Sequence, residues 1–202
     1  MIKAIIEILI AVIGAYLIGS IPTGYIIVKL FTGQDIRKSG SGSTGATNVK
    51  RVMGKKWFFI VMLLDALKGA LPVLLAKVFA TDFVSIGLLP VLAAVAVILG
   101  HSKSIFLNFS GGKSVASGVG TILALNIIVG LSIALIWSIV TYISRYVSVG
   151  SIVALSLSPI IMYLCKAPIA YVIYCFIGAI YIIYLHRENI LRLIKGTENK
   201  VR

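Results

Sequence analysis

Five long stretches without a single charged side chain limit most strongly what this chain can fold into. About 20 consecutive apolar residues cross the ~30 Å hydrocarbon core of a bilayer as one helix. The chain is 59% hydrophobic and only 12% charged, whereas soluble domains average ~45–50% and ~25%. A soluble core of this size cannot bury so much apolar surface, so a soluble enzyme and a disordered chain are both excluded. The stretches are residues 8–28, 83–100, 115–144, 146–165 and 167–185, with a sixth, 57–80, interrupted by Asp65, Lys68 and Lys77.

The 30-residue stretch 115–144 decides the number of membrane spans. As a single helix it would be about 45 Å long, so we expect two shorter spans with a turn near residues 126–130. Lys and Arg favour the cytoplasmic side, and two spans here place both the basic stretch 29–56 and the basic C-terminal tail on that side. The sequence therefore predicts an all-α membrane protein with seven transmembrane helices, an outside N-terminus and a cytoplasmic C-terminus, forming one domain over residues 1–202. This topology accounts for most of the net charge of +13, so no nucleic acid partner is expected.

The polar residues gather in loops that this topology places in the cytoplasm, and the first loop is residues 40–51, GSGSTGATNVKR. Its three glycines permit positive φ and close backbone approach. Successive N–H groups in such a loop can form an anion-binding concavity. Arg51 adds a side chain that binds phosphate through two parallel hydrogen bonds. The loop predicts a phosphate site, and the alternative is a flexible Gly/Ser linker.

A second loop, Gly111-Gly112-Lys113-Ser114, opens the next apolar stretch. It resembles the end of a Walker A loop, but Leu107 stands where that motif requires glycine, so nucleotide hydrolysis is not indicated. A helix N-terminus still offers free N–H groups and its dipole to a phosphate. The loop predicts a second phosphate site, and the alternative is a helix start with an interfacial lysine.

Two further polar segments flank predicted spans, residues 145–148 (RYVS) and 186–192 (HRENILR). Helical spacing puts His186, Asn189 and the Arg192–Leu193 pair on one face. The alternative for both segments is an ordinary basic flank of a membrane helix.

Ionisable residues inside the membrane are restricted to one predicted span, where Asp65 and Lys68 stand three residues apart on one helix face. Each alone would cost ~2.5–3.5 kcal/mol near the bilayer centre, and as a pair they largely offset each other. The sequence favours a structural role for the pair but leaves a contact with substrate open. His101 follows a predicted span and is expected to be a loop histidine with satisfied hydrogen bonds.

Several known catalytic arrangements are absent from the sequence. Neither histidine has an aspartate five residues later, where Phe106 and Leu191 stand instead. The six Asp and Glu residues are scattered, which does not suit a two-metal carboxylate site. There is no Gly-x-Ser-x-Gly nucleophile motif. No metal and no cofactor are therefore expected, and no side chain is identified as a general base.

Taken together, these segments resemble those of the bacterial acyl-phosphate:glycerol-3-phosphate acyltransferases, and the resemblance covers nearly the whole chain. The family's seven-helix architecture with an outside N-terminus agrees with the topology deduced from charge. The matching segments are GSIP at 19–22, the loop 40–51, D-x-x-K-G at 65–69, GH at 100–101, GGK at 111–113, RYVS at 145–148 and HRENI-x-RL at 186–193.

The resemblance implies a reaction and a location. A fatty acyl group would move from an acyl phosphate to the 1-hydroxyl of sn-glycerol 3-phosphate, giving lysophosphatidate and phosphate in the first step of phospholipid synthesis. The protein would be a multi-pass protein of the bacterial cytoplasmic membrane, in contact with membrane lipid, with its active site facing the cytoplasm.

The resemblance also implies roles for individual residues. Ser41, Arg51, His186 and Asn189 are expected to act in catalysis. Substrate binding is implied for these four together with Gly42, Gly45, Thr47 and Asn48 in the first loop, Gly111, Gly112 and Lys113 in the glycerol-phosphate loop, and Ser148.

Four serines depart from the family pattern: Ser43 stands for Asn, Ser104 for Pro, Ser110 for Lys and Ser114 for Gly. Because Ser110 and Ser114 belong to the glycerol-phosphate loop, a divergent relative with another acceptor or without activity is one alternative. A small transporter of organic phosphates is a second, and a non-catalytic membrane partner of lipid-synthesis enzymes is a third.

Overall fold

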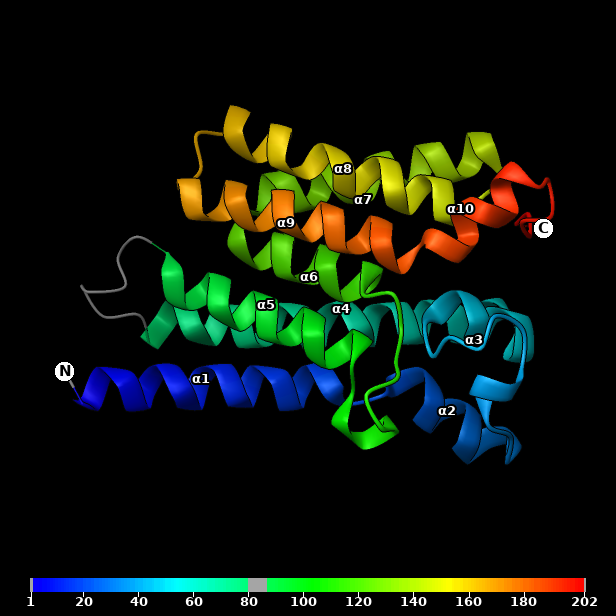
Figure 1. Ribbon diagram of the computed structural model, residues 1–202, viewed down its shortest axis with the longest axis horizontal. Helices are drawn as coiled ribbons and strands as arrows, with labels where there is room; N and C mark the ends of the chain where they lie inside the picture. The colour runs from blue at the N-terminus through cyan, green and yellow to red at the C-terminus, as the bar shows by residue number, and fades with distance from the viewer. Residues whose placement is uncertain (1, 80–86, 202) are drawn as a thin grey trace. The chain divides into compact units, whose positions relative to one another are not determined.

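The computed structural model describes residues 2–79 and 87–201, and its regular secondary structure in these ranges is helical (Figure 1). The all-α prediction is confirmed over this part of the chain. The predicted end of one span at residue 80 and the predicted start of another at residue 83 lie outside the described residues. The contacts divide the chain into two compact units, residues 1–121 and 122–202.

The first unit is built on three packed helices, α1 (Ile2–Ser20), α4 (Lys55–Phe79) and α5 (Leu88–Ser102). Glycines let α1 and α5 approach backbone to backbone: a Cβ on Gly19 would collide with the backbone of Val97, and one on Gly100 with the carbonyl of Tyr16. Small residues at a helix contact are the usual means of close packing in a membrane. The core between these helices is formed by Ala15, Ala76, Leu89, Ala93, Ala96 and Val97.

A second group of short helices carries the first polar loop. Pro22 separates α1 from α2 (Thr23–Thr32), since proline has no N–H to continue the helix. A 3₁₀ turn, η1 (Ile36–Lys38), and α3 (Ala46–Met53) follow, and α3 packs on α4. The buried residues Val28, Ile36, Val49 and Val61 fix these elements in place. The loop 39–45 is therefore attached at both ends to packed elements, η1 and α3.

The predicted break in the 30-residue apolar stretch is confirmed. Helix α6 (Val115–Leu125) ends before Asn126, and α7 (Ile127–Ser144) begins after it. The Asn126 side chain accepts hydrogen bonds from the N–H groups of Ile128 and Val129 at 3.0 and 3.2 Å, which is the ordinary way an asparagine caps a helix start. The two helices are unequal, with 11 and 18 residues.

The second unit is an antiparallel group in which α8 (Val147–Leu164) packs against both α7 and α9 (Ile169–Leu185). Gly150 allows the close contact of α8 with α7, because a Cβ there would collide with Thr141. The chain bends by 57° between α9 and α10 (Arg187–Ile194). Within this unit, α10 and the C-terminus lie at the same end as the α7–α8 turn (Figure 1).

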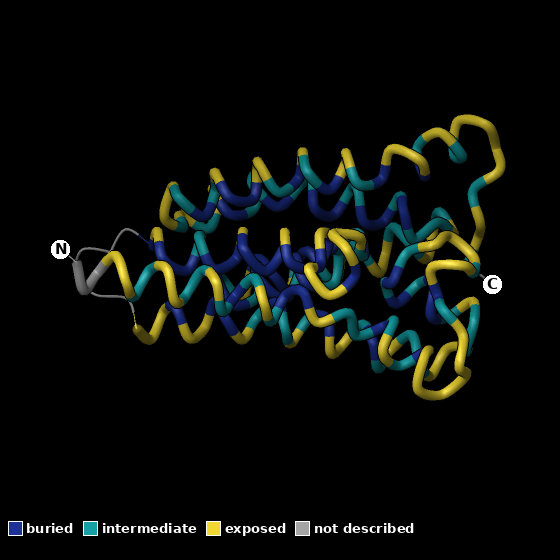
Figure 2. The backbone as a smooth tube through the Cα atoms, turned by 60° about the horizontal axis from the view of Figure 1, so that its bottom comes forward, coloured by how far each residue is buried: buried dark blue, intermediate teal, exposed yellow. Residues whose placement is uncertain are grey.

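Large apolar side chains line the outside of the long helices, which is the pattern expected for lipid contact. On α1, Ile6, Leu9, Ile13 and Leu17 are exposed at helical spacing, and exposed positions recur along the helices between buried ones (Figure 2). A soluble monomer rarely exposes so much contiguous apolar surface. Among the described residues, four helical segments are long and apolar enough to cross a membrane, or five if the bent α9–α10 pair counts as one; α5 and α6 are shorter.

Candidate functional site

The first polar loop is organised by the side chain of Asn48, which is 1% exposed. Its Oδ1 accepts the N–H of Ser41 at 3.0 Å. Its Nδ2 donates to the carbonyls of Ser39 and Ser43 at 2.9 Å and to that of Ile36 at 3.3 Å. The sequence predicted Asn48 in substrate binding, whereas the structure shows its amide bonded to the backbone of its own loop.

The glycines of this loop have different tasks. Gly40 and Gly42 adopt positive φ of 59° and 71°, as the sequence predicted, and a Cβ on Gly40 would collide with Oδ1 of Asn48. Gly45 has an ordinary φ of −75° and is the N-cap of α3. The predicted left-handed freedom is therefore used at two of the three glycines.

Ser41 and Arg51 are members of this loop whose side chains are open to a ligand. Both are exposed, and the Arg51 Cδ atom lies 3.4 Å from where a Cβ on Gly40 would stand. The arginine therefore runs alongside the residue that precedes Ser41, while Thr47 lies half-buried in the first turn of α3. Arg51 stands in the last turn of the short helix α3, and an exposed guanidinium that runs back along the loop is a suitable group for binding phosphate.

The Gly-Gly-Lys loop lies directly on the end of α5. The Gly112 N–H donates to the carbonyl of His101 at 3.1 Å. A Cβ on Gly111 would collide with that carbonyl, and a Cβ on Gly112 with Nε2 of the His101 ring. Both glycines are therefore required by close approach to His101. Lys113 is half-buried at the point where the loop enters α6.

The four serines that depart from the family pattern all make hydrogen bonds. Ser104 donates to the carbonyl of Ser20 at 2.6 Å, Ser110 to Leu107 at 2.6 Å, and Ser114 to Ile98 at 3.0 Å. Ser43 accepts the N–H of Gly45 at 3.3 Å. The backbone of Ser114 has a positive φ of 57°, a conformation that glycine adopts without strain. The departures thus leave none of these four hydroxyls unpaired.

A buried ionic group lies between the helices of the first unit. Lys68 Nζ lies 2.8 Å from Asp65 Oδ1, and the Thr23 hydroxyl donates to the same carboxylate oxygen at 3.0 Å. Lys68 also donates to the Ile21 carbonyl at 2.7 Å. The predicted pairing of Asp65 with Lys68 on one helix face is therefore confirmed.

His101 belongs to the same group. Its Nδ1 is 3.8 Å from Asp65 Oδ1 and 2.8 Å from the hydroxyl of Ser117. The prediction that its hydrogen bonding is satisfied is confirmed, but its predicted loop position is wrong: it lies in the last turn of α5, because the helix continues past the apolar stretch to Ser102.

In the second unit, a carboxylate from the C-terminal tail gathers three polar side chains. One oxygen of Glu198 accepts from Ser148 at 3.0 Å and from Asn189 at 2.6 Å. The other oxygen accepts from Nε of Arg192 at 2.7 Å. Burial raises the pKa of this carboxyl, but the hydrogen bonds from Asn189, Arg192 and Ser148 outweigh that effect and hold its pKa below the ordinary value. Sequence reasoning did not identify Glu198.

The remaining predicted residue of this unit, His186, stands at the bend between α9 and α10. It is 3% exposed, and its Nδ1 lies 2.8 Å from the carbonyl of Ile182. The predicted common face of Asn189 and Arg192 is confirmed, since both bind Glu198. The tail is also tied to the α7–α8 turn, where the N–H of Val201 donates to the carbonyl of Arg145 at 2.7 Å.

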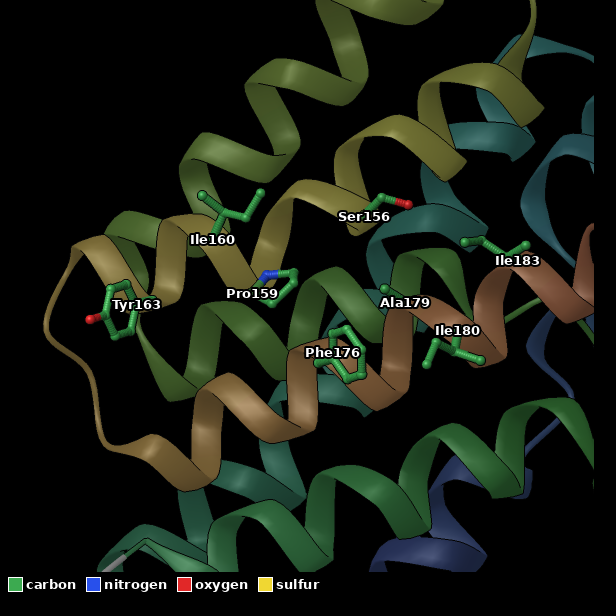
Figure 3. Close-up of a pocket in the computed structure, with 8 residues that line it drawn as sticks. All are labelled: Ser156, Pro159, Ile160, Tyr163, Phe176, Ala179, Ile180 and Ile183. Carbon is green, nitrogen blue, oxygen red and sulfur yellow. The ribbon is translucent and has the colours of Figure 1, made fainter.

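A groove of about 500 Å³ runs between α8 and α9. Its lining is apolar except for Ser156 and the Tyr163 hydroxyl, so it can accommodate hydrocarbon but offers no cation to a phosphate (Figure 3). The lining residues are Ser156, Pro159, Ile160, Tyr163, Phe176, Ala179, Ile180 and Ile183.

The chain is similar to known proteins over most of its length. A family model described as glycerol-3-phosphate acyltransferase matches residues 9–196. A glycerol-3-phosphate acyltransferase of Trichormus variabilis is 46% identical over 94% of this chain and 90% of its own length. One of Desulforamulus reducens is also 46% identical, over 94% of this chain and 93% of its own length.

Solved structures give the same result. The chain is similar to the crystal structure of PlsY, an integral membrane glycerol 3-phosphate acyltransferase, in its glycerol 3-phosphate form, with a TM-score of 0.90 and 39% identity over 97% of this chain and 96% of that one. The lysophosphatidic acid form matches with a TM-score of 0.87 and 38% identity over the same shares of the two chains.

Proposed function

We propose that this chain, which belongs to the glycerol-3-phosphate acyltransferase family, transfers a fatty acyl group from an acyl phosphate to the 1-hydroxyl of glycerol 3-phosphate. The proposal rests on two separate glycine-containing loops, 40–51 with Arg51 and 111–114 with Lys113, in a chain whose residues 9–196 match the family. The products would be lysophosphatidate and inorganic phosphate. As a member of this family the chain is an acyltransferase, so the transporter alternative is set aside.

Two anionic substrates can share a site only where cations and N–H groups offset their repulsion. Two like unit charges at 4 Å repel by ~4 kcal/mol at an effective dielectric constant of 20. Ser41, Thr47 and Arg51 would bind one phosphate, with Asn48 holding the loop that presents them. Gly111, Gly112 and Lys113 would bind the phosphate of glycerol 3-phosphate chiefly through the Lys113 ammonium, with Gly112 held by the His101 carbonyl.

The chemistry needs little beyond this binding. An acyl phosphate is an activated mixed anhydride, so attack by the 1-hydroxyl on its carbonyl forms the ester and releases phosphate. The departing phosphate can accept the hydroxyl proton, so no protein general base is required. His186 and Asn189 would assist the transfer, and Ser148 would contact substrate.

The proposed topology has seven spans, with the N-terminus outside and the polar loops in the cytoplasm. In the first unit the N-terminus and the α2–α3 region lie at opposite ends (Figure 1). Single cysteines at the exposed positions 38 and 199 should react only from the cytoplasm, and one at position 166 only from outside, in a protein without its two native cysteines. Opposite faces for 38 and 199 would contradict seven spans.

The assignment of the two loops is tested by Lys113→Ala. Losing one hydrogen bond to a charged group costs ~1.5–3 kcal/mol, or roughly 10- to 150-fold. The KM for glycerol 3-phosphate should rise by about that factor, while the KM for acyl phosphate changes little. Lys103→Ala, at an exposed lysine that follows α5, is the matched control and should leave both KM values near wild type. A rise only in the KM for acyl phosphate would reverse the assignment.

A further inference from the structure

The buried ionic group of the first unit connects more elements than charge neutralisation requires. Asp65 is 2% exposed and Ser117 is fully buried. The group draws Thr23 from α2, Asp65 and Lys68 from α4, His101 from α5 and Ser117 from α6. Asp65 and Lys68 neutralise each other, and each has a further hydrogen-bond partner, Thr23 for Asp65 and the Ile21 carbonyl for Lys68. Neutralising the two buried charges therefore does not require His101 or Ser117.

His101 is the member of this group that also contacts a substrate loop. On one side its Nδ1 faces Ser117 at 2.8 Å and Asp65 at 3.8 Å. On the other side its Nε2 lies against Gly112 so closely that a Cβ there would collide with it. Its carbonyl accepts the Gly112 N–H at 3.1 Å. One edge of the ring is therefore held by Ser117 of α6 and Asp65 of α4, and the opposite edge contacts the loop.

The loop is also fixed at its far end. Ser114 donates to the carbonyl of Ile98 at 3.0 Å, which lies one turn before His101 in α5. Lys113 thus stands between two residues that are both anchored on α5. A shift of the His101 ring would change the position of Gly112, the residue next to Lys113.

We propose that His101 is a positioning residue: held by Ser117 and Asp65, its ring sets the place of the Gly111-Gly112-Lys113 loop and thereby the affinity for glycerol 3-phosphate. This inference rests on the proposed function, which assigns that loop to glycerol 3-phosphate. The Asp65–Lys68 pair then acts beyond stability, because it holds the residue that shapes the acceptor site.

The test compares kinetic constants of His101→Ala, His101→Gln and Ser117→Ala in nanodiscs. One net hydrogen bond is worth ~0.5–1.5 kcal/mol, or roughly 2- to 12-fold. Ser117→Ala should raise the KM for glycerol 3-phosphate within that range, and His101→Ala should raise it further. Glutamine, whose amide reaches as far as Nε2, should restore part of the loss. In all three variants the KM for acyl phosphate should stay within about twofold of wild type, which is the lower end of the 2- to 12-fold range for one hydrogen bond.

Ser158→Ala is the matched control, because Ser158 is also a buried serine, in α8, and donates to a helix carbonyl. It should leave both KM values unchanged. Thermal unfolding of each variant separates a positioning effect from a merely structural one. A lowered Tm with unchanged KM values, or an equal rise of both KM values, would overturn the role of His101.

Calorimetric binding of glycerol 3-phosphate distinguishes failure of this inference from failure of the proposed reaction. A wild type that binds glycerol 3-phosphate without forming lysophosphatidate would contradict the reaction, and weaker binding by His101→Ala would still support the inference. Equal binding by wild type and His101→Ala would overturn the inference alone. A wild type that does not bind glycerol 3-phosphate would overturn both.

Discussion

Each unit of this molecule contains a carboxylate that binds several polar side chains, and the two carboxylates are held in different ways. Asp65 lies between helices of the first unit and is paired with Lys68, whose side chain is 9% exposed. Glu198 belongs to the C-terminal tail of the second unit and is paired with Arg192, whose side chain is 32% exposed. The first carboxylate joins packed helices of its unit, whereas the second holds a tail that follows the last helix.

This difference predicts which property of the protein changes most when each contact is removed. Removing one partner of a buried ion pair leaves an uncompensated charge, which is costly because lipid and protein offer it little solvation. Removing Glu198 leaves the charge of Arg192, which water can reach because that side chain is 32% exposed. We therefore expect the stability of the fold to depend more on Asp65, and the arrangement of Ser148 and Asn189 to depend more on Glu198.

The largest expected effect is that of Asp65→Asn, which leaves the Lys68 ammonium buried without its carboxylate. Breaking a buried pair costs about 3–5 kcal/mol, so the yield of folded protein and its Tm in detergent should fall sharply. Asp35→Asn is the matched control, because the Asp35–Arg37 pair lies at the surface with partly exposed side chains and should contribute less than ~1 kcal/mol.

The double variant Asp65→Asn/Lys68→Met should recover much of the loss, since it removes the uncompensated charge. A single variant as stable as wild type would show that the pair has no structural role.

A smaller effect is expected from Glu198→Gln, which keeps the shape but loses the charge that binds Arg192. Because Arg192 is partly exposed, the loss should lie near the lower end of ~1.5–3 kcal/mol for a charged hydrogen bond. Glu188→Gln, at an exposed glutamate of α10, should have no comparable effect on the Tm. Equal effects of the two changes would mean that the tail contributes no stability.

The pH dependence of stability sharpens the comparison. Because the folded pKa of Glu198 is lowered, the stability from its ionised form is present above the unfolded value of about 4.3. That stability is lost as the pH falls through the lower folded value. The Tm of wild type should therefore drop on acidification below about pH 4.5 by more than the Tm of Glu198→Gln. Parallel curves for the two proteins would contradict a lowered pKa.

The smallest expected effect is that of Ser114→Gly. Glycine relieves the positive φ of 57°, a strain of ~1 kcal/mol or more for other residues. The change also removes the hydrogen bond to Ile98, worth ~0.5–1.5 kcal/mol. The free energy of unfolding should change by less than about 1 kcal/mol, so the Tm should stay close to that of wild type. The KM for glycerol 3-phosphate should stay unchanged or fall. A large rise in that KM would show that the serine hydroxyl contacts the acceptor.

The same two carboxylates show how far sequence reasoning reached. Asp65 and Lys68 are three residues apart on one helix, so helical periodicity alone predicts their pairing. Glu198 and Ser148 are 50 residues apart, and nothing in the local pattern of a polar tail indicates that contact. The break at Asn126 was predictable because an apolar stretch of that length exceeds one span.

Other features of the site depend on tertiary packing and could not be predicted from the sequence. The contacts of Asn48 are made with carbonyls that meet only when the loop has folded, whereas the family resemblance implied only a ligand contact. His101 was assigned to a loop because the apolar stretch ends before it, while the helix continues for two residues to Ser102. The glycines at 111 and 112 were attributed to phosphate binding, and contact with His101 supplies a second reason for them.

The central claim is that acyl phosphate and glycerol 3-phosphate react on this protein, and product stoichiometry tests it most directly. Purified protein in nanodiscs should form lysophosphatidate and inorganic phosphate in equal amounts from acyl phosphate and glycerol 3-phosphate, with neither product when either substrate is omitted. Acyl-CoA in place of acyl phosphate should give no lysophosphatidate. Transfer from acyl-CoA alone, or release of phosphate that does not depend on glycerol 3-phosphate, would contradict the account.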